Sequence, residues 1–329
     1  MTEILIGTCS WTDPTLLATD FYPAEINTAE KRLKHYASQF PLVEVDSTYY
    51  SMPVERTARL WVERTPSNFT FNIKAFRLFT QHPTKLEALP ADLRQVVLPT
   101  RKPNLYYRDL PADVRDQLWQ RFGEALLPLD SAGKLGVVLF QFPQWFYPDD
   151  ASKEYLVECK RKLSQFRLAI EFRNGVWLDE NRRQDTLAFL RENKLAYVCV
   201  DEPQGFKSSV PPLVEASSDI GVVRFHGRNR DNWQKKGISV AERFKYIYND
   251  EELGEWLPGL AGLAANVQQL HVLFNNCYGD YGIRNAHDMG RLMKSQMHLF
   301  PDSLKTRKGE KAGNAQERST WFEHHPRLG

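Results

Sequence analysis

Eight short runs rich in β-branched and aromatic residues recur along the 329-residue chain, and stretches with helical spacing separate them. Repeated strand and helix units build a parallel sheet, and eight is the number of strands that closes a barrel. An open doubly wound sheet commonly begins with a phosphate-binding glycine loop, but no GxGxxG follows the first run. The pattern therefore predicts an α/β fold, a (β/α)8 TIM-type barrel. The runs cover residues 4–11, 43–50, 69–75, 135–143, 167–174, 196–201, 221–228 and 269–276.

The helical stretches support one barrel domain over residues 1–302. Ala29, Leu33 and Tyr36 share a stripe of the helix expected over residues 28–39, after a capping Asn27 or Thr28. Residues 303–329 are polar and are expected to form a partly flexible tail. Further helices are expected over residues 54–62, 155–163, 186–193, 251–263 and 287–297.

One connection is too long for a simple crossover. About 60 residues, 76–134, separate the third run from the fourth. Residues 111–129 have helical spacing, whereas residues 86–107 are interrupted by proline and are expected to be irregular. We expect this insertion to form a small, mostly helical cap over the mouth of the barrel.

The composition excludes several classes of protein. Hydrophobic residues make up 42% of the chain and its formal charge is only +2, so a large core is available and no long-range field attracts nucleic acid or an anionic membrane. No run reaches the roughly 18 apolar residues that a membrane helix needs. Cys9, Cys159, Cys199 and Cys277 show no CxxC spacing, which favours free thiols and a cytoplasmic location.

Near the ends of the strands, polar residues occupy every second position, so that they share one face of each strand. Successive strand residues face opposite sides, and the active sites of such barrels lie at the C-terminal ends of the strands. The sequence therefore predicts a charged pocket at that mouth, with paired ion bridges that only fill the lumen as the alternative. The residues of inward parity are Glu44, Asp46, Thr48, Asn72, Lys74, Glu171, Arg173, Asp201, Arg224, His226 and Arg228. The fourth strand contributes Gln141, and the eighth ends in Asn275 and Asn276.

These residue types suggest acid–base chemistry. Glu171 and Asp201 are the candidate acid and base, and His226, between two arginines, is a candidate neutral base whose pKa is pushed down. The same three residues could ligate a metal, but the neighbouring cations disfavour a divalent ion and favour an anion, so neither metal nor cofactor is expected. The expected substrate-binding residues are Asp46, Lys74, Gln141, Arg173, Arg224, Asn275 and Asn276.

Other residues near the strand ends suggest weaker hypotheses. Cys9 and Cys277 end strands that become neighbours when the barrel closes, so a reactive thiol pair is one interpretation and two inert buried thiols are the other. Aromatic side chains just past the strand ends could stack on a sugar ring or a base, or could only wedge loops onto the barrel. These aromatics are Trp11, Tyr49, Tyr50 and Trp177.

The motifs GTCSWTDP, VEVDSTYYSMP, EFR, RFHGR and FNN resemble those of the YecE-like family, also called the domain of unknown function 72 family. The resemblance extends from Ile6 to Ala286 and implies a TIM barrel whose reaction is unassigned. It also implies that most of the inward-parity residues named above are recurrent polar positions of the family. The opening motif commonly reads GTSGW in the family, and here Cys9 and Ser10 replace the Ser-Gly pair.

Two functions from different classes remain open at this point. The first is an enzyme, a hydrolase or isomerase, acting on a small anionic or sugar-like substrate at the barrel mouth. The alternative is a nucleic-acid or other ligand-binding module without catalysis, which the near-neutral charge disfavours. Its expected surface track comprises Lys34, Arg101, Lys102, Arg228, Arg230, Lys235, Lys236 and the basic tail.

Overall fold

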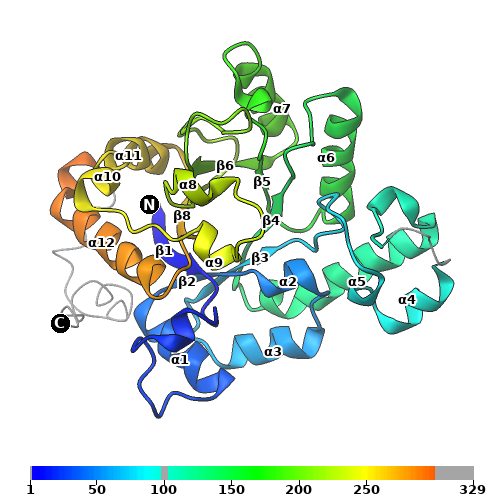
Figure 1. Ribbon diagram of the computed structural model, residues 1–329, viewed down its shortest axis with the longest axis horizontal. Coiled ribbons are helices and arrows are strands. Elements are labelled where there is room, and N and C mark those ends of the chain that lie inside the picture. Colours follow the sequence, from blue (N-terminus) through cyan, green and yellow to red (C-terminus); the bar gives the residue numbers. More distant parts are fainter. Residues whose placement is uncertain (1, 98–102, 301–329) are drawn as a thin grey trace.

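Eight parallel strands form a closed barrel in chain order, which confirms the predicted TIM-type fold (Figure 1). The structure is a computed structural model that describes residues 2–97 and 103–300. All eight predicted runs contain a strand, although most strands end sooner than predicted. The strands are β1 (Glu3–Cys9), β2 (Leu42–Val45), β3 (Thr70–Lys74), β4 (Leu135–Gln141), β5 (Leu168–Glu171), β6 (Leu195–Asp201), β7 (Ile220–Phe225) and β8 (Gln269–Phe274).

Helices surround the strands. Thr28 caps the first helix, because its side chain accepts a hydrogen bond from the Lys31 amide at 3.2 Å. Twelve helices lie in the described part of the chain: α1 (Ala29–Gln39), α2 (Ser47–Tyr50), α3 (Glu55–Glu63), α4 (Ala91–Val96), α5 (Ala112–Ser131), α6 (Asp150–Lys162), α7 (Arg183–Glu192), α8 (Arg230–Trp233), α9 (Val240–Arg243), α10 (Asp250–Gly254), α11 (Leu257–Asn266) and α12 (Tyr281–Ser295).

The alternation of strands and helices fails once. Residues 202–219, between β6 and β7, contain no helix, and all of them lie within the described chain. Pro203, Pro211 and Pro212 interrupt this segment, and proline inside a helix removes a hydrogen bond and clashes with the preceding turn. An irregular loop therefore takes the place of one helix of the outer ring.

The long insertion does not form the predicted cap. Its long helix α5 packs against α3, and α4 lies at the right-hand edge of Figure 1, away from the strands. Near its start, Arg77 and His82 lie against the ring of Tyr49 at the rim. The chain over the mouth comes instead from the β7–β8 connection, where the rings of Trp233 and Phe244 lie 6.3 and 6.0 Å from the His226 ring.

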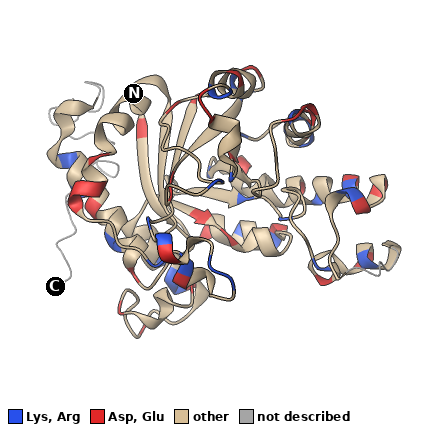
Figure 2. Cartoon of the chain, turned by 45° about the horizontal axis from the view of Figure 1, so that its top comes forward, with Lys and Arg blue, Asp and Glu red and all other residues tan. Residues whose placement is uncertain are grey.

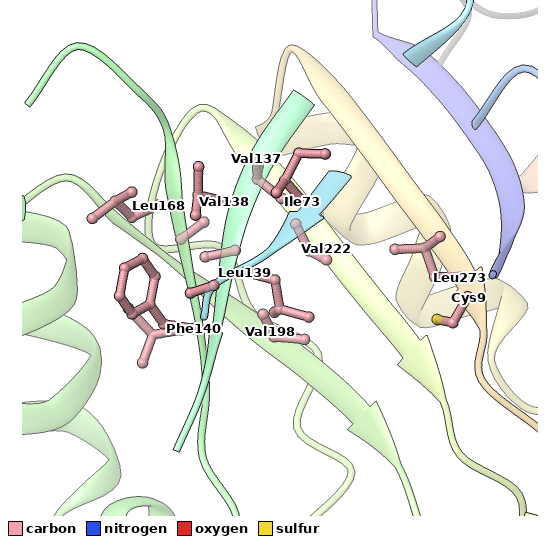
Figure 3. Close-up of a cluster of buried hydrophobic side chains, with 14 of the residues drawn as sticks. Cys9, Ile73, Val137, Val138, Leu139, Phe140, Leu168, Val198, Val222 and Leu273 are labelled. Carbon is pink, nitrogen blue, oxygen red and sulfur yellow. The ribbon is translucent and has the colours of Figure 1, made fainter. Parts of the chain in front are cut away.

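The register of the strands decides which side chains enter the lumen. Val200 on β6 pairs with Arg224 on β7, and Gln141 on β4 pairs with Glu171 on β5. Toward the N-terminal ends of the strands the lumen is mostly apolar, with Leu139, Val198 and Val222 fully or almost fully buried (Figure 3). One buried polar pair lies at this depth, because Nδ1 of His271, beside Val222, is 3.0 Å from Oδ1 of Asn72. The charged residues therefore lie in one layer above a mostly apolar plug.

Residues of both charges occur along the helices. Figure 2 shows blue and red segments interspersed along the helices, while the strands are mostly tan. No helix among the described residues combines the length and the apolar character needed to cross a bilayer. Arg228, from the expected basic track, is paired with Asp201 and Glu255, and Arg101 and Lys102 lie outside the described residues.

The residue after β1 is in a conformation that favours glycine. Ser10 has φ of 78°, in the left-handed region, at the position where the related motif commonly has glycine. Its amide donates to the Glu44 carbonyl at 2.8 Å, which fixes the turn beside β2. The left-handed backbone is thus kept although the residue that adopts it easily is absent.

Replacing Ser10 with glycine should therefore stabilise the protein. We expect Ser10→Gly to raise the free energy of unfolding by up to about 1 kcal/mol, because the left-handed conformation costs a residue with a Cβ about that much. Gly133 has φ of +66° with open space around it, so Gly133→Ala should lower the same quantity. Urea denaturation measures both, and the same direction of change in the two variants would contradict the argument.

Candidate functional site

A buried guanidinium lies at the centre of the charged layer. Arg224 on β7 is 0% exposed, and it donates from Nη1 to Glu171 and from Nη2 to Glu44. These carboxylates come from β5 and β2, so one side chain bridges three strands across the lumen. Its Nη2 also lies 3.5 Å from the Cys9 sulfur, and its Nε has no acceptor in the described part of the chain.

Glu171 is surrounded by donors. Besides Arg224, its Oε1 lies 2.7 Å from Nε of Arg173, 2.6 Å from Nε2 of Gln141 and 3.1 Å from Nε2 of His226. Burial opposes its charge, but Arg224 and then Arg173 outweigh burial and hold the pKa of Glu171 well below its usual range. Glu171 is therefore an ionised anchor with no exposed surface, a state that does not suit a proton donor.

His226 lies buried between Glu171 and Arg173. Burial, followed by the charge of Arg173, lowers its pKa to about 3. A proton on Nε2 can be donated to Glu171, and Nδ1 can then accept from Nδ2 of Asn275 at 2.9 Å. Both ring nitrogens are thus engaged inside the protein, and the side chain has no exposed surface. This arrangement holds Glu171 in place.

Asp201 is not brought to this cluster. It pairs in register with Phe225, and its carboxylate accepts from Tyr248 at 2.7 Å, from Trp256 at 2.8 Å and from Arg228 at 2.8 Å. The expected pair with Glu171 is therefore wrong, because Asp201 has the opposite parity and fastens β6 to the helical layer outside the barrel.

Asn276 also has outward parity. Its Nδ2 lies 2.9 Å from the carbonyl of Tyr246 and 2.8 Å from Oδ1 of Asn285 on α12. Like Asp201, it attaches the strand end to the outer layer, whereas its neighbour Asn275 contacts His226 in the lumen. The expected substrate-binding role of Asn276 therefore lacks the required placement.

Asp46 and Lys74 are the charged pair that reaches the opening. Nζ of Lys74 lies 3.1 Å from Oδ1 of Asp46, and their side chains are 12% and 25% exposed. Burial opposes the charge of Asp46, but Lys74 and Arg224 bring its pKa below the usual range. Asp46 is therefore an ionised carboxylate with access to the mouth.

Glu44, directly behind Asp46, behaves differently. Its complete burial raises its pKa to about 7, since Arg224 compensates only in part and Asp46 adds repulsion. Oε2 of Glu44 is buried without a hydrogen-bond partner in the described chain, and Oδ1 of Asp46 is buried against Lys74. A proton on Glu44 allows a hydrogen bond between the two carboxyl groups, so they can share one proton near neutral pH.

A second carboxyl group of this kind is Glu202, which the sequence interpretation missed. Its Oε2 lies 2.9 Å from Nη1 of Arg173, and its Oε1 accepts from the Val210 amide at 2.8 Å. Burial raises its pKa to about 7 despite Arg173. Glu202 follows Asp201, so the correct parity of β6 would have found it.

Aromatic side chains surround the mouth. The Trp233 ring lies 5.3 Å from the guanidinium of Arg173, and Tyr49 packs edge to face against His82. Of the expected stacking residues, Tyr50 is 55% exposed, whereas Trp11 and Trp177 are buried against other rings and serve packing. A separate open depression of about 620 Å³ lies beside the turn Gly175–Leu178 and contains none of the lumen charges.

Cysteine chemistry finds little support in the structure. All four cysteines are free thiols, as predicted. The Cys277 thiol donates to the Cys9 carbonyl at 2.9 Å, and burial raises the pKa of both thiols well above the usual value. A low-pKa nucleophile is not formed here.

No group of three potential metal-ligating side chains converges in residues 2–97 and 103–300. The proposed ligands Glu171, Asp201 and His226 are divided between the lumen and the outer layer. Glu171 with His226 offers two donor atoms, but Arg224 and Arg173 already occupy that carboxylate. The expectation that the protein needs no metal or cofactor stays a prediction.

Comparison with known proteins gives a consistent result. The sequence profile of the family described as "Protein of unknown function DUF72" matches residues 5–309. The chain is 32% identical over 294 residues to the UPF0759 protein YunF of Bacillus subtilis, covering 88% of this chain and 94% of YunF. Crystal structures of a DUF72 family protein from Enterococcus faecalis and one from Thermotoga maritima are 25% and 26% identical, with TM-scores of 0.71 and 0.69. The matches cover 88% and 89% of this chain and 95% and 99% of those chains.

Removing the central guanidinium should destabilise the barrel strongly. We expect Arg224→Met to lower the free energy of unfolding at pH 8 by about 3–5 kcal/mol, because it leaves two buried carboxylates without their partner. The loss should be smaller at pH 5, where Glu44 is protonated. Urea denaturation at both pH values measures it, with Arg59→Met at the exposed pair with Glu55 as a control of little effect. An equally small loss for Arg224→Met would contradict the bridging role.

Glu44→Gln should change how stability depends on pH. The folded pKa of about 7 exceeds the ordinary 4.5, so the contribution of Glu44 to stability is full below pH 4.5 and is lost as the pH rises through 7. Glutamine mimics the protonated form and loses nothing. Relative to wild type, the variant should therefore gain on the order of 1–3 kcal/mol between pH 5 and pH 8.

Urea denaturation at the two pH values tests this expectation. Exposed Glu87→Gln is the control and should shift stability by a similar amount at both pH values. If the free energy of unfolding of Glu44→Gln changes between pH 5 and pH 8 as much as that of the wild type, Glu44 does not take up a proton in this range.

Proposed function

The chain belongs to the DUF72 family of proteins of unknown function, and we propose that its barrel mouth is an active site for acid–base chemistry on a small hydroxylated anion. The observation that carries this proposal is the accessible pair of Asp46 and Lys74, backed by a buried carboxyl group whose pKa is about 7. A base, a cation and a nearby proton store are the parts that proton transfer requires.

The roles follow from charge and access. Asp46 is ionised and partly exposed, so it is the base that removes a proton from the substrate. The ammonium of Lys74, 3.1 Å away, stabilises negative charge that develops on a substrate oxygen. Return of the same proton from Asp46 to a neighbouring atom completes an isomerisation. In a hydrolysis, Asp46 instead takes the proton from the attacking water and delivers it to the leaving group.

The buried residues support this pair. Arg224 and Glu171 fix the position and charge of Glu44, while Gln141, Arg173, His226 and Asn275 hold Glu171 from the other sides. We assign them positioning and electrostatic roles, since several of them have no exposed surface. Asp201 and Asn276 hold the strand ends to the outer layer. We also keep the cytoplasm as the proposed location, because all four cysteines are free thiols.

Asp46→Asn should abolish turnover without unfolding the protein. We expect a loss of at least about a hundredfold in rate, the usual size for a general base. The wild type and the variant are incubated in deuterated buffer with a panel of sugar phosphates and hydroxy acids, and NMR records consumption and deuterium incorporation. Asp116→Asn is the matched control, because Asp116 also pairs with a lysine, Lys162, but on the outer surface.

Two results would overturn the proposal. One is consumption of a substrate at equal rates by the wild type and Asp46→Asn. The other is binding of a panel member without any consumption or exchange, which would favour the ligand-binding module without catalysis.

A further inference from the structure

We infer that the rim beside Asp46 and Lys74 is a subsite for a phosphoryl group, formed by Arg77 and His82 and bordered by Tyr49 and Trp145. The inference rests on the proposed function, since it names the substrate class as a small phosphorylated molecule that carries a ring. The subsite itself depends on contacts that the proton-transfer pair does not use.

Arg77 is the cation at the mouth without a carboxylate partner. Lys74, Arg173 and Arg224 each form an ion pair, whereas no carboxylate of the described residues lies within 4.0 Å of Arg77. The guanidinium lies over the Tyr49 ring at 5.3 Å, and its Nε is buried without an acceptor. A buried donor without an acceptor costs free energy, which a ligand oxyanion would recover.

His82 adds a second feature. Burial, and then the charges of Arg77, Lys74 and Arg173, lower its pKa to about 3. The Thr80 hydroxyl donates to the Arg77 carbonyl at 3.1 Å, so it accepts from Nδ1 of His82 at 2.9 Å. This leaves Nε2 without a protein partner in the described chain, and a bound phosphate that raises the pKa of His82 lets the protonated Nε2 donate to it.

The balance of charge at the mouth also favours an anion with more than one charge. Four carboxyl groups lie there, and two of them, Glu44 and Glu202, have pKa values of about 7. The four cations are Lys74, Arg77, Arg173 and Arg224, and the four carboxyl groups are Glu44, Asp46, Glu171 and Glu202. When Glu44 and Glu202 are both protonated, the mouth carries an excess of two positive charges. A phosphate dianion neutralises this excess, whereas a carboxylate neutralises half of it.

Aromatic faces explain why the phosphorylated molecule should carry a ring. The Trp145 ring packs edge to face against His82 at 5.8 Å, yet Trp145 is 54% exposed. The Tyr49 ring also packs against the His82 ring, at 5.4 Å, and its centre lies 5.1 Å from Nζ of Lys74. A ligand ring stacked on Trp145 would therefore lie next to His82, in the phosphoryl subsite, and close to Asp46 and Lys74.

The test is a titration of the full chain with inorganic phosphate at pH 6 and constant ionic strength, followed by NMR of the His82 imidazole. His82→Asn assigns the resonance. We expect a saturable shift and a rise in the pKa of His82 with phosphate. Arg77→Gln should weaken binding by at least about tenfold, the usual effect of losing one charge-assisted contact.

Arg108→Gln is the matched control, because Arg108 also lies over a tyrosine ring, Tyr106, but carries no role in the subsite. It should bind phosphate as the wild type does. Arg77→Lys, which keeps the charge without the two-pronged donor, should give an intermediate affinity, and it replaces Arg77→Gln if that variant fails to fold. Three results would overturn the phosphoryl subsite. Phosphate binding could fail to saturate, both Arg77 variants could bind phosphate as tightly as the wild type, or the wild type could bind acetate as tightly as phosphate.

The two proposals fail separately. Asp46→Asn should bind phosphate at least as tightly as the wild type, because a nearby negative charge is removed. Phosphate binding without turnover of any panel member would overturn the proposed function and leave the subsite. Turnover that depends on Asp46 without phosphate binding would overturn the subsite and leave the function.

Discussion

The ion pairs of Arg224 with Glu171 and Glu44 set the conditions for the rest of the lumen. Burying these charges is tolerable only because each has a partner, and the partners come from three different strands. Arg224 cannot neutralise both carboxylates fully, so burial raises the pKa of Glu44, whereas Arg173 adds enough positive charge to keep Glu171 ionised. The accessible Asp46 thereby gains a neighbour that exchanges protons near neutral pH.

The sequence predicted the barrel and most of the lumen, because alternation was visible on the second, third, fifth and seventh strands. It failed on β6, where all seven residues are buried and the pattern of apolar and polar residues does not distinguish the two faces. Pairing with β7 sets that parity, since Val200 lies beside Arg224. Pairing between distant segments is not visible in a single strand, so Asp201 was placed inside and Glu202 was overlooked.

The paths of the long connections could not be predicted from the sequence either. The length of the 76–134 insertion was evident, but its path depends on α5 packing beside α3, a contact between elements far apart in the sequence. The shorter β7–β8 connection instead places Trp233 above Arg173. Candidate residues at the rim, His82 and Arg77, lie in the insertion, and only the structure shows that they contact Tyr49 on α2.

Two buried carboxyl groups with a pKa of about 7 give this mouth a property that a rigid array of charges lacks. Glu44 lies against Arg224 and Glu202 lies against Arg173, so the two carboxyl groups can gain or lose a proton separately, and the ion pair of Arg224 with Glu171 remains in both cases. Arrival of an anion at the mouth should therefore be accompanied by protonation of these two carboxyl groups, and its departure by their deprotonation. Titration of buried groups can in this way adjust the charge of the mouth to that of its ligand.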